Sequence, residues 1–176
     1  MKKLAALFVL SLFFFFNYTK AQSVYTIDNT QPTAGSNFIN FTDAVEFLNS
    51  LSIPSDGVIF NVSAGQTFNE PYPISILNRN GSSTGWIIFQ KNGNGENPVV
   101  KYDSPANTDS IVRIVKSSYI SWDAIDITDA DISNAYSPGT ALRIRGSHDI
   151  LIKNTKIYNF GRSEEHTSEL QSRITI

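Results

Sequence analysis

An internal repeat in the second half of the chain constrains the fold more than any other feature. Ser110–Asp129 can be laid over Thr140–Asn159 at one constant offset, without a gap. Identical or similarly apolar residues coincide along this alignment, in the pairs Val112/Leu142, Arg113/Arg143, Ile114/Ile144, Ser117/Ser147, Ile120/Ile150, Trp122/Ile152 and Ile127/Ile157. The agreeing positions alternate as one face of a strand does. The repeat therefore predicts a stack of similar units, each packed on the next.

A weaker repeat precedes it, because Ile87 and Phe89 align with Ile120 and Trp122 at a slightly longer offset. Chance alignment is the alternative explanation for both repeats, since the alternation of short strands repeats itself readily. If the stack is real, one set of side chains lies inside and another outside. Leu142, Ile144, Ile150, Ile152 and Ile157 are expected to point inward, and Arg143, Leu151 and Lys153 outward.

Most of the remaining chain also favours short strands. The sequence is 41% hydrophobic and 12% aromatic, enough for one packed domain. Apolar stretches of a few residues recur between Gly, Asn and Ser, which is typical of a sandwich, a barrel or a solenoid. These stretches are SVYTI, GVIFNV, PISIL, GWIIFQ, NPVVKY, SIVRIV, SYISWDAIDI, ALRIR, DILIKN and TKIYN. The internal repeat favours the solenoid.

One helix is expected, near the beginning of the chain. Thr42 can cap it, and Val45, Leu48 and Leu51 follow at nearly helical spacing. The Ile53-Pro54 pair should end it, because the residue before a proline disfavours helical backbone.

The N-terminus has the pattern of a secretory signal. Lys2 and Lys3 precede an apolar stretch, Leu4–Phe16, that is short for a membrane span. Cleavage is expected after Ala21, and an N-terminal membrane anchor is the alternative. The whole chain has net charge −2; the predicted signal contributes three lysines and the last fifteen residues a net −1, which leaves −4 for residues 22–161. This acidity gives no electrostatic reason to expect nucleic acid or an anionic membrane as partner.

Four stretches together resemble the opening coils of a known class of exported protein. They are DGVIFNVSAGQTFNEPYPISI, GWIIFQKNGNGENPVV, SYISWDAIDIT and RGSHDILIKNTKIYN. They resemble secreted right-handed parallel β-helix proteins of the pectate-lyase-like superfamily, in the style of large exported proteins of Bacteroidota. The resemblance covers about Val24–Phe160. It implies an all-β fold in which a short N-terminal helix, Phe41–Leu51, caps coils of three strands.

The resemblance also suggests features inside the coils. Asn154 falls where the family often stacks asparagines, but Ala124, its partner one repeat earlier, departs from that pattern. Calcium is a cofactor that the resemblance alone would allow, and no cofactor is expected from the residues themselves. The absence of cysteine excludes disulfides and thiolate metal sites.

Three arginines are the candidate ligand-binding residues. Arg113, Arg143 and Arg145 should point outward from one strand face, with Arg113 and Arg143 stacked on adjacent coils. Stacked guanidinium groups repel unless an acidic group joins them, and an acidic polysaccharide could supply that group through paired hydrogen bonds. The alternative is ordinary surface arginines paired with loop carboxylates.

For the other polar and aromatic residues, we expect a structural role first and a functional role second. His148 lies in a predicted turn, and the sugar-stacking candidates Tyr72, Tyr119 and Tyr136 have packing as their alternative. The acidic cluster Asp123, Asp126, Asp129 and Asp131 lacks a recognisable metal-ligand spacing. In the repeat, Asp123 lies opposite Lys153 and Asp126 opposite Lys156, which predicts cross-strand ion pairs on an outer face.

The end of the chain departs abruptly from the repeat. Arg162–Ser172 reads RSEEHTSELQS, which resembles, codon by codon, the translation of a common sequencing adapter. Residues 162–176 are therefore expected to be a non-native tail, irregular or loosely helical, and the β-helix is expected to be truncated at about Gly161. A genuine polar tail is the alternative.

The expected function is that of a secreted or cell-surface β-helix protein that interacts with polysaccharide. One alternative is a non-catalytic structural or adhesive surface protein. Another is a polysaccharide lyase or glycoside hydrolase whose active site lies beyond residue 161. No catalytic constellation is identified in the sequence, because it contains no Ser-His-Asp order, no phosphate loop and no outstanding pair of carboxylates.

Overall fold

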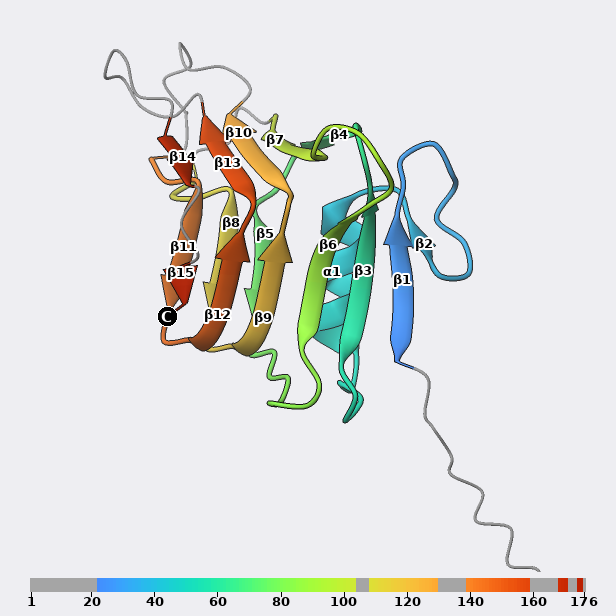
Figure 1. The fold of residues 1–176 in the computed structure, drawn as a ribbon, viewed down its shortest axis with the longest axis vertical. Helices are drawn as coiled ribbons and strands as arrows, with labels where there is room; N and C mark the ends of the chain where they lie inside the picture. The colour runs from blue at the N-terminus through green and yellow to red at the C-terminus, as the bar shows by residue number, and fades with distance from the viewer. Residues whose placement is uncertain (1–21, 104–107, 130–138, 159–167, 171–173, 176) are drawn as a thin grey trace, which may run out of the picture.

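The computed structural model describes residues 22–103, 108–129, 139–158, 168–170 and 174–175. These residues form three β-sheets and one helix, α1 (Figure 1). No helix in this part of the chain is long and apolar enough to cross a membrane. The predicted signal sequence, residues 1–21, lies outside the described residues.

The largest sheet, called sheet A here, has seven strands in the order β15-β12-β9-β6-β3-β1-β2. Its strands are β1 Ser23–Ile27, β2 Asn37–Phe38, β3 Val58–Ser63, β6 Ile87–Asn92, β9 Ser118–Asp123, β12 His148–Lys153 and β15 Ile174–Thr175. All neighbours pair in parallel except β12 and β15, which are antiparallel. Figure 1 shows β1, β3, β6, β9 and β12 side by side with their arrows in one direction.

Two smaller sheets complete the fold. Sheet B has the order β14-β13-β10-β7-β4 and sheet C the order β11-β8-β5. The strands of sheet B are β4 Thr67–Glu70, β7 Val99–Tyr102, β10 Asp126–Asp129, β13 Thr155–Tyr158 and β14 Ser168–Leu170. Those of sheet C are β5 Ile74–Leu77, β8 Val112–Val115 and β11 Leu142–Arg145. Only β13 and β14 pair antiparallel in these two sheets. The expected all-β fold with parallel sheets is therefore confirmed.

From β3 to β13 the chain visits sheets A, B and C in unchanging rotation, and each such passage is called a circuit here. In sheet A the register pairs Val58 with Ile87, Ile87 with Ile120, and Ile120 with Ile150. The last two pairs have the longer and the shorter of the two offsets predicted from the sequence. Sheet C repeats the shorter offset, because Arg143 pairs with Arg113. The repeat found in the sequence is thus a real structural register, and the arrangement is compatible with a β-helix.

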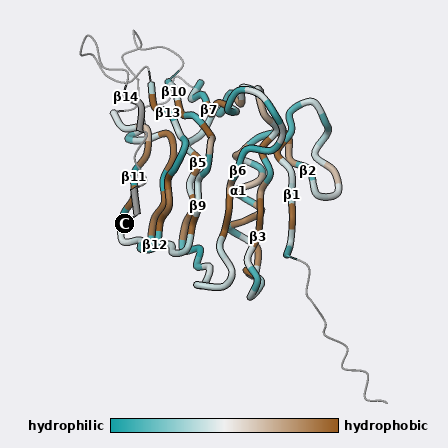
Figure 2. The backbone as a smooth tube through the Cα atoms, viewed as in Figure 1, coloured by the Kyte–Doolittle hydropathy of each residue, from teal (hydrophilic) through white to brown (hydrophobic). Residues whose placement is uncertain are grey.

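Alternate residues of each strand form the interior, as the pleat of a strand requires. Ile150 and Ile152 are buried, whereas Leu142, Ile144 and Ile157 are partly buried and pack against the core. The inward direction predicted for these five residues is therefore confirmed. Figure 2 shows hydrophobic colour along the strands and mainly hydrophilic colour in the loops that join them.

Aromatic rings on the inward face of sheet A contact one another from strand to strand. Tyr25, Phe60, Phe89 and Trp122 occupy paired positions on β1, β3, β6 and β9. The Phe60 and Phe89 rings are stacked with centroids 4.7 Å apart, and Trp122 follows at 5.5 Å from Phe89. Offset stacking of this kind adds to the free energy gained by burial. The same pairing therefore aligns the strands and packs the core.

Helix α1, Phe41–Ser50, begins at the expected Phe41 and ends one residue before the expected Leu51, but it has a different cap. The side chain of Asn40 accepts a hydrogen bond from the backbone N–H of Asp43 at 2.7 Å, so Asn40 and not Thr42 is the N-cap. Thr42 lies in the first turn, where its hydroxyl donates to Glu70 at 2.6 Å. The prediction of Thr42 as the cap was wrong because Asn caps a helix at least as well, and the third residue after Asn40 is free to donate.

The helix also covers one edge of sheet C. The side-chain amide of Asn49 donates to the carbonyl of Ser75 at 2.8 Å and accepts from the N–H of Leu77 at 3.1 Å. These are the groups through which a further strand would pair with β5. The Arg79 guanidinium donates to the carbonyls of Leu48 and Leu51, at the end of α1 where the helix dipole is negative. Together these contacts close the N-terminal end of the stack.

Residues with left-handed backbone mark the corners between strands, and they recur at the interval of the repeat. The pairs Lys116/Gly146, Tyr119/Asp149 and Ala124/Asn154 all have φ between +48° and +59°. Asn154 has left-handed backbone at its corner, a conformation that asparagine tolerates. Its side chain donates to Asp123 at 2.8 Å. The described residues therefore show no asparagine ladder at Asn154.

Two short strands lie in the last fifteen residues, called the tail here. β15 pairs with β12, and β14 pairs with β13, both antiparallel. The expectation that the tail is irregular or loosely helical is wrong for these residues, because the open edges of β12 and β13 offer unpaired backbone groups to any extended segment. The resemblance of the tail to adapter sequence stays a prediction, which resequencing of the source DNA beyond Gly161 would test.

Candidate functional site

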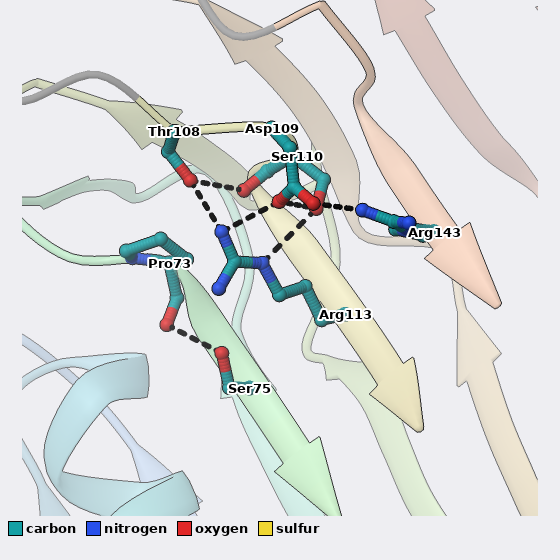
Figure 3. A network of polar contacts seen from close by, with 7 residues as sticks. All are labelled: Pro73, Ser75, Thr108, Asp109, Ser110, Arg113 and Arg143. Carbon is teal, nitrogen blue, oxygen red and sulfur yellow. Dashed lines mark hydrogen bonds and ion pairs between the residues drawn. The ribbon is translucent and has the colours of Figure 1, made fainter. Parts of the chain in front are cut away.

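The outer face of sheet C brings two of the three candidate arginines together. Ser75, Arg113 and Arg143 occupy paired positions on β5, β8 and β11. Inward neighbours on the same strands are buried or partly buried, so the alternate residues point outward. Figure 3 shows the Arg113 and Arg143 side chains reaching toward the same segment, which precedes β8.

Asp109 joins the two guanidinium groups. One of its carboxylate oxygens lies 2.6 Å from Arg113 Nη2, and the other accepts from Arg143 Nη1. The Asp109 side chain is 49% exposed, that of Arg143 44%, and that of Arg113 30%, so solvent screens these ion pairs. The acidic group that stacked arginines require is thus supplied by the protein itself, as the alternative interpretation of the arginines anticipated.

Arg113 is held more firmly than Arg143. Its Nη2 atom donates to the Thr108 hydroxyl at 2.6 Å, and its Nε atom donates to the buried Ser110 hydroxyl at 3.1 Å. Within the described residues, Arg143 contacts only Asp109 through its guanidinium group. Residues just before its own strand therefore position Arg113. Arg143 is positioned by Asp109, which comes from the preceding circuit.

Arg145 does not join this network. It is exposed at the end of β11, where its register partner is Val115, and the described residues give it no ion pair. The face therefore carries two guanidinium groups that share one carboxylate, with a third guanidinium group two residues further along the same strand. The net charge of this face is therefore positive, although the chain as a whole is acidic.

The acidic cluster has two different structural roles. Asp123 and Lys153 form the expected cross-strand ion pair at 2.9 Å, on paired residues of β9 and β12. Asp126 does not form the expected pair with the Lys156 side chain. It is buried, and its carboxylate accepts from the Lys156 backbone N–H at 2.9 Å and from the Asn97 side chain at 2.8 Å. The prediction failed because backbone and amide donors engage the Asp126 carboxylate, while the Lys156 side chain is exposed.

The remaining residues of that cluster do not form a metal site in the described part of the chain. Asp129 is buried at the end of β10, and Asp131 lies outside the described residues. Among the described residues, no group of three or more His, Cys, Asp or Glu side chains could hold a metal ion. Nothing in this region therefore assigns a position for calcium.

Of the other singled-out residues, Tyr119 and His148 contact each other, and Tyr72 lies elsewhere on the surface. Tyr72 is 65% exposed between β4 and β5, and Tyr136 lies outside the described residues. His148 is the first residue of β12, where its Nδ1 atom lies 2.8 Å from the Asp149 carboxylate. Its ring contacts Tyr119 edge to face, with centroids 6.0 Å apart. No nucleophile stands within reach of His148 in the described contacts.

The most buried carboxyl group was missed by sequence reasoning. Glu70 is fully buried at the end of β4, where it accepts hydrogen bonds from the N–H groups of Phe41 and Thr42 at 2.8 and 3.1 Å. Burial raises the pKa of Glu70, although these hydrogen bonds oppose the shift. An acidic residue at an inward strand position was the available signal. Its role is to hold the positive end of α1 against sheet B.

No protein-family model matches this chain, and no curated protein or solved structure was found to match it.

Proposed function

We propose that this chain belongs to a secreted right-handed parallel β-helix protein of the pectate-lyase-like type, and that the outer face of sheet C binds acidic polysaccharide. The unchanging rotation through three parallel sheets and the helix at the first circuit support the fold assignment. The tripartite N-terminus supports export, with cleavage before Gln22. N-terminal sequencing of secreted material that begins at Met1 would contradict the export proposal.

The Asp109 bridge is the observation that carries the ligand proposal. Asp109 shows that a carboxylate fits between Arg113 and Arg143, which lie on neighbouring strands of one sheet. A uronate carboxylate presents the same two oxygen atoms and can take the place of Asp109. Because the Asp109 side chain is half exposed, its displacement leaves the released carboxylate in water instead of burying it.

A polymeric ligand fits this face better than an isolated anion. Arg113 and Arg143 lie on strands separated by about 4.8 Å, and Arg145 continues the positive charge along β11. A chain with a carboxylate on every sugar can contact more than one of these groups at once, and each additional contact adds to the effective concentration of the next. Binding of this kind weakens as salt screens the charges.

The direct test is to measure binding of polygalacturonate, alginate and a glycosaminoglycan to the whole chain at low and moderate salt. Arg143→Ala should weaken binding about tenfold, because it removes the guanidinium group that only Asp109 engages. Lys156→Ala is the matched control, since it removes one positive charge from sheet B and should change binding little. Unchanged binding by Arg143→Ala would exclude this face.

Asp109→Asn sharpens the test in the opposite direction. Loss of the internal carboxylate leaves both guanidinium groups without their shared partner, so the affinity for the acidic polymer should rise. A fall in affinity would mean that Asp109 positions the arginines for the ligand and does not compete with it. In that case the outer face of sheet C would remain the proposed binding site, and Asp109 would assist binding instead of competing with it.

A structural or adhesive role without catalysis is the second candidate. It is favoured by the same bridge, because Asp109 partly neutralises the arginine face in the absence of ligand. Incubating the protein with the same polymers separates the classes. Absorbance from unsaturated products would indicate a lyase, new reducing ends alone would indicate a hydrolase, and neither would favour the adhesive role.

A further inference from the structure

A second surface lies at the corner where the chain passes from sheet C to sheet A. Trp86 and Tyr119 immediately precede Ile87 and Ile120, which pair with each other, so their side chains leave neighbouring strands at the same level. His148 begins the next strand. The three rings, called the aromatic row here, come from the N-terminal ends of β6, β9 and β12, which are neighbouring strands of sheet A (Figure 1).

The rings form one continuous line across three circuits. The centroids of Trp86 and Tyr119 are 5.6 Å apart, and those of Tyr119 and His148 are 6.0 Å apart. Both contacts are edge to face, with interplanar angles of 84° and 83°. Trp86 and Tyr119 are partly exposed and His148 is exposed, so the row lies on the surface and not in the core.

The polar tips of two rings are unused. Among the described residues, neither the Trp86 indole N–H nor the Tyr119 hydroxyl makes a hydrogen bond to protein, and the contrast within the molecule is Trp122, whose indole N–H donates to the carbonyl of Ile125 at 2.9 Å. Trp and Tyr side chains that combine an apolar ring with a free polar tip suit ligands with both apolar faces and hydroxyl groups. His148 adds a further ring nitrogen, since Asp149 engages only Nδ1.

The backbone at Tyr119 adds an independent observation. Its φ is +56°, a left-handed conformation that is uncommon for a bulky aromatic residue. One circuit later the same corner is occupied by Asp149, a residue type that accepts this conformation more readily. Strain of this kind often marks a residue kept for its side chain. The corner therefore holds an aromatic ring in a backbone conformation that aromatic residues seldom adopt.

Hydroxyl and amide groups flank the row. Gly81 lies against Tyr119, because a Cβ on Gly81 would meet the Tyr119 Cβ at 3.1 Å. The loop that contains Gly81 carries exposed Asn80 and Thr84, and ends at Trp86. The charged side chains within three residues of the row are Asp149 and the exposed Lys116 and Arg145. The hydroxyl and amide groups around the rings suit a hydroxyl-rich ligand, which need not carry charge.

We propose that Trp86, Tyr119 and His148 bind a neutral sugar chain, whose rings pack on the aromatic faces while its hydroxyl groups accept from the Trp86 indole N–H and the Tyr119 hydroxyl. The chain runs across the strands, in the direction in which the circuits stack. This site lies apart from Asp109, Arg113 and Arg143, and it does not depend on the acidic-polysaccharide proposal.

Tryptophan fluorescence of the whole chain tests the proposal. The sequence has only two tryptophans, and Trp122 is fully buried, so a ligand-dependent change in emission reports on Trp86. Cellohexaose, xylohexaose and mannohexaose are the probes, and at least one should change the emission saturably. No change with any of the three, confirmed by calorimetry, would overturn the proposal.

Variants then locate the site. Tyr119→Asn removes the ring but keeps a residue that tolerates the left-handed backbone, and it should weaken binding at least tenfold. Tyr72→Ala, which removes an exposed tyrosine elsewhere, is the matched control and should bind as the parent does. Equal affinities for the parent and Tyr119→Asn would overturn the proposal, provided that both give the same circular dichroism and thermal midpoint.

The two proposed sites fail separately. Hexagalacturonate binding should be weakened in Arg143→Ala and unchanged in Tyr119→Asn, whereas neutral-sugar binding should show the reverse. If Tyr119→Asn and Arg143→Ala weaken both ligands equally, the aromatic row is not a separate neutral-sugar site.

Discussion

The two ends of the described stack bury the same side-chain positions to different extents. In sheet C, Ile76 and Ile114 are fully buried, but their partner Ile144 on β11 is only partly buried. At the other end, α1 covers β5 with the Asn49 side chain and places Phe41 in the interior. An inward residue is therefore buried completely only where something lies on both sides of its circuit, as expected for a fold in which each unit contacts its neighbours alone.

The largest expected difference between the ends comes from shortening paired isoleucines. Ile114→Ala should lower the free energy of unfolding by about 3–5 kcal/mol, because the site is fully enclosed. Ile144→Ala should cost about 1–2 kcal/mol, since its side chain is already partly in water. Urea unfolding of both variants measures the difference. Equal costs would show that the β11 end is as well covered as the middle of the stack.

The next largest loss of stability is expected from glycine-to-alanine substitutions at two corners. A Cβ on Gly57 would lie 2.2 Å from the Trp86 carbonyl oxygen, whereas one on Gly146 would meet only the Lys116 side chain at 3.7 Å. Gly57→Ala should cost about 2–4 kcal/mol, from left-handed backbone and from displacement of the neighbouring turn. Gly146→Ala should cost about 1–2 kcal/mol, the backbone contribution alone. Thermal unfolding compares them, and a larger loss for Gly146→Ala would contradict the crowding argument.

The pH dependence of stability should reveal the titration of Glu70, which contacts α1 at the N-terminal end of the stack. Burial raises the pKa of Glu70 above its usual value of 4.5, so the folded chain holds this proton more tightly than the unfolded chain does. The free energy of unfolding should therefore fall as the pH rises from the unfolded pKa to the folded pKa of Glu70. Glu70→Gln should abolish this dependence, in urea titrations from pH 4 upward. A dependence that survives in Glu70→Gln would assign it to another group.

Asp28 should give a pH dependence of opposite sign when the urea titration is extended to about pH 2. Hydrogen bonds, the largest from the Thr30 side chain and the next from the Gln66 side chain, lower the pKa of Asp28 from 3.8 to about 2. Its contribution to stability is present above pH 3.8 and is lost as the pH falls toward about 2. Asp28→Asn should remove the acid-side loss and leave the Glu70 dependence unchanged.

The smallest effect is expected at the ion pair near the less covered end. Lys153→Ala removes the partner of Asp123 on a partly exposed face, so it should cost only about 0.2–1 kcal/mol. The loss should shrink further in 1 M salt, where screening is strong. Chemical unfolding with and without salt measures it. A cost above that of Ile144→Ala would mean that charge, and not burial, stabilises the last circuit.

Sequence reasoning worked best where the information is local and repeated. The strands around Ile114, Ile120 and Ile127 and their counterparts one repeat later were predicted with the register that the structure has. Alternation identifies a strand and its inward face, and a constant interval identifies its neighbour. The Asp123–Lys153 pair was predictable for the same reason, since both residues occupy the same position in successive repeats.

Contacts between unlike segments were not predictable in this way. Asp109 lies outside the aligned repeat, and Glu70 reaches back to the first turn of a helix far ahead of it in the chain. The pairing of β14 and β15 with the last circuit was also missed, because open strand edges accept an extended segment of almost any sequence.

The sequence by itself determined the strands, their inward faces and the interval at which they stack, because side-chain alternation and repetition are written directly in the order of residues. Only the tertiary structure decided which carboxylate neutralises Arg113 and Arg143, which residue caps α1, and which rings meet in the aromatic row. Those contacts depend on how corners and loops from different circuits approach in space. The contacts of a corner residue such as Tyr119 are therefore not visible in the pattern of the strands around it.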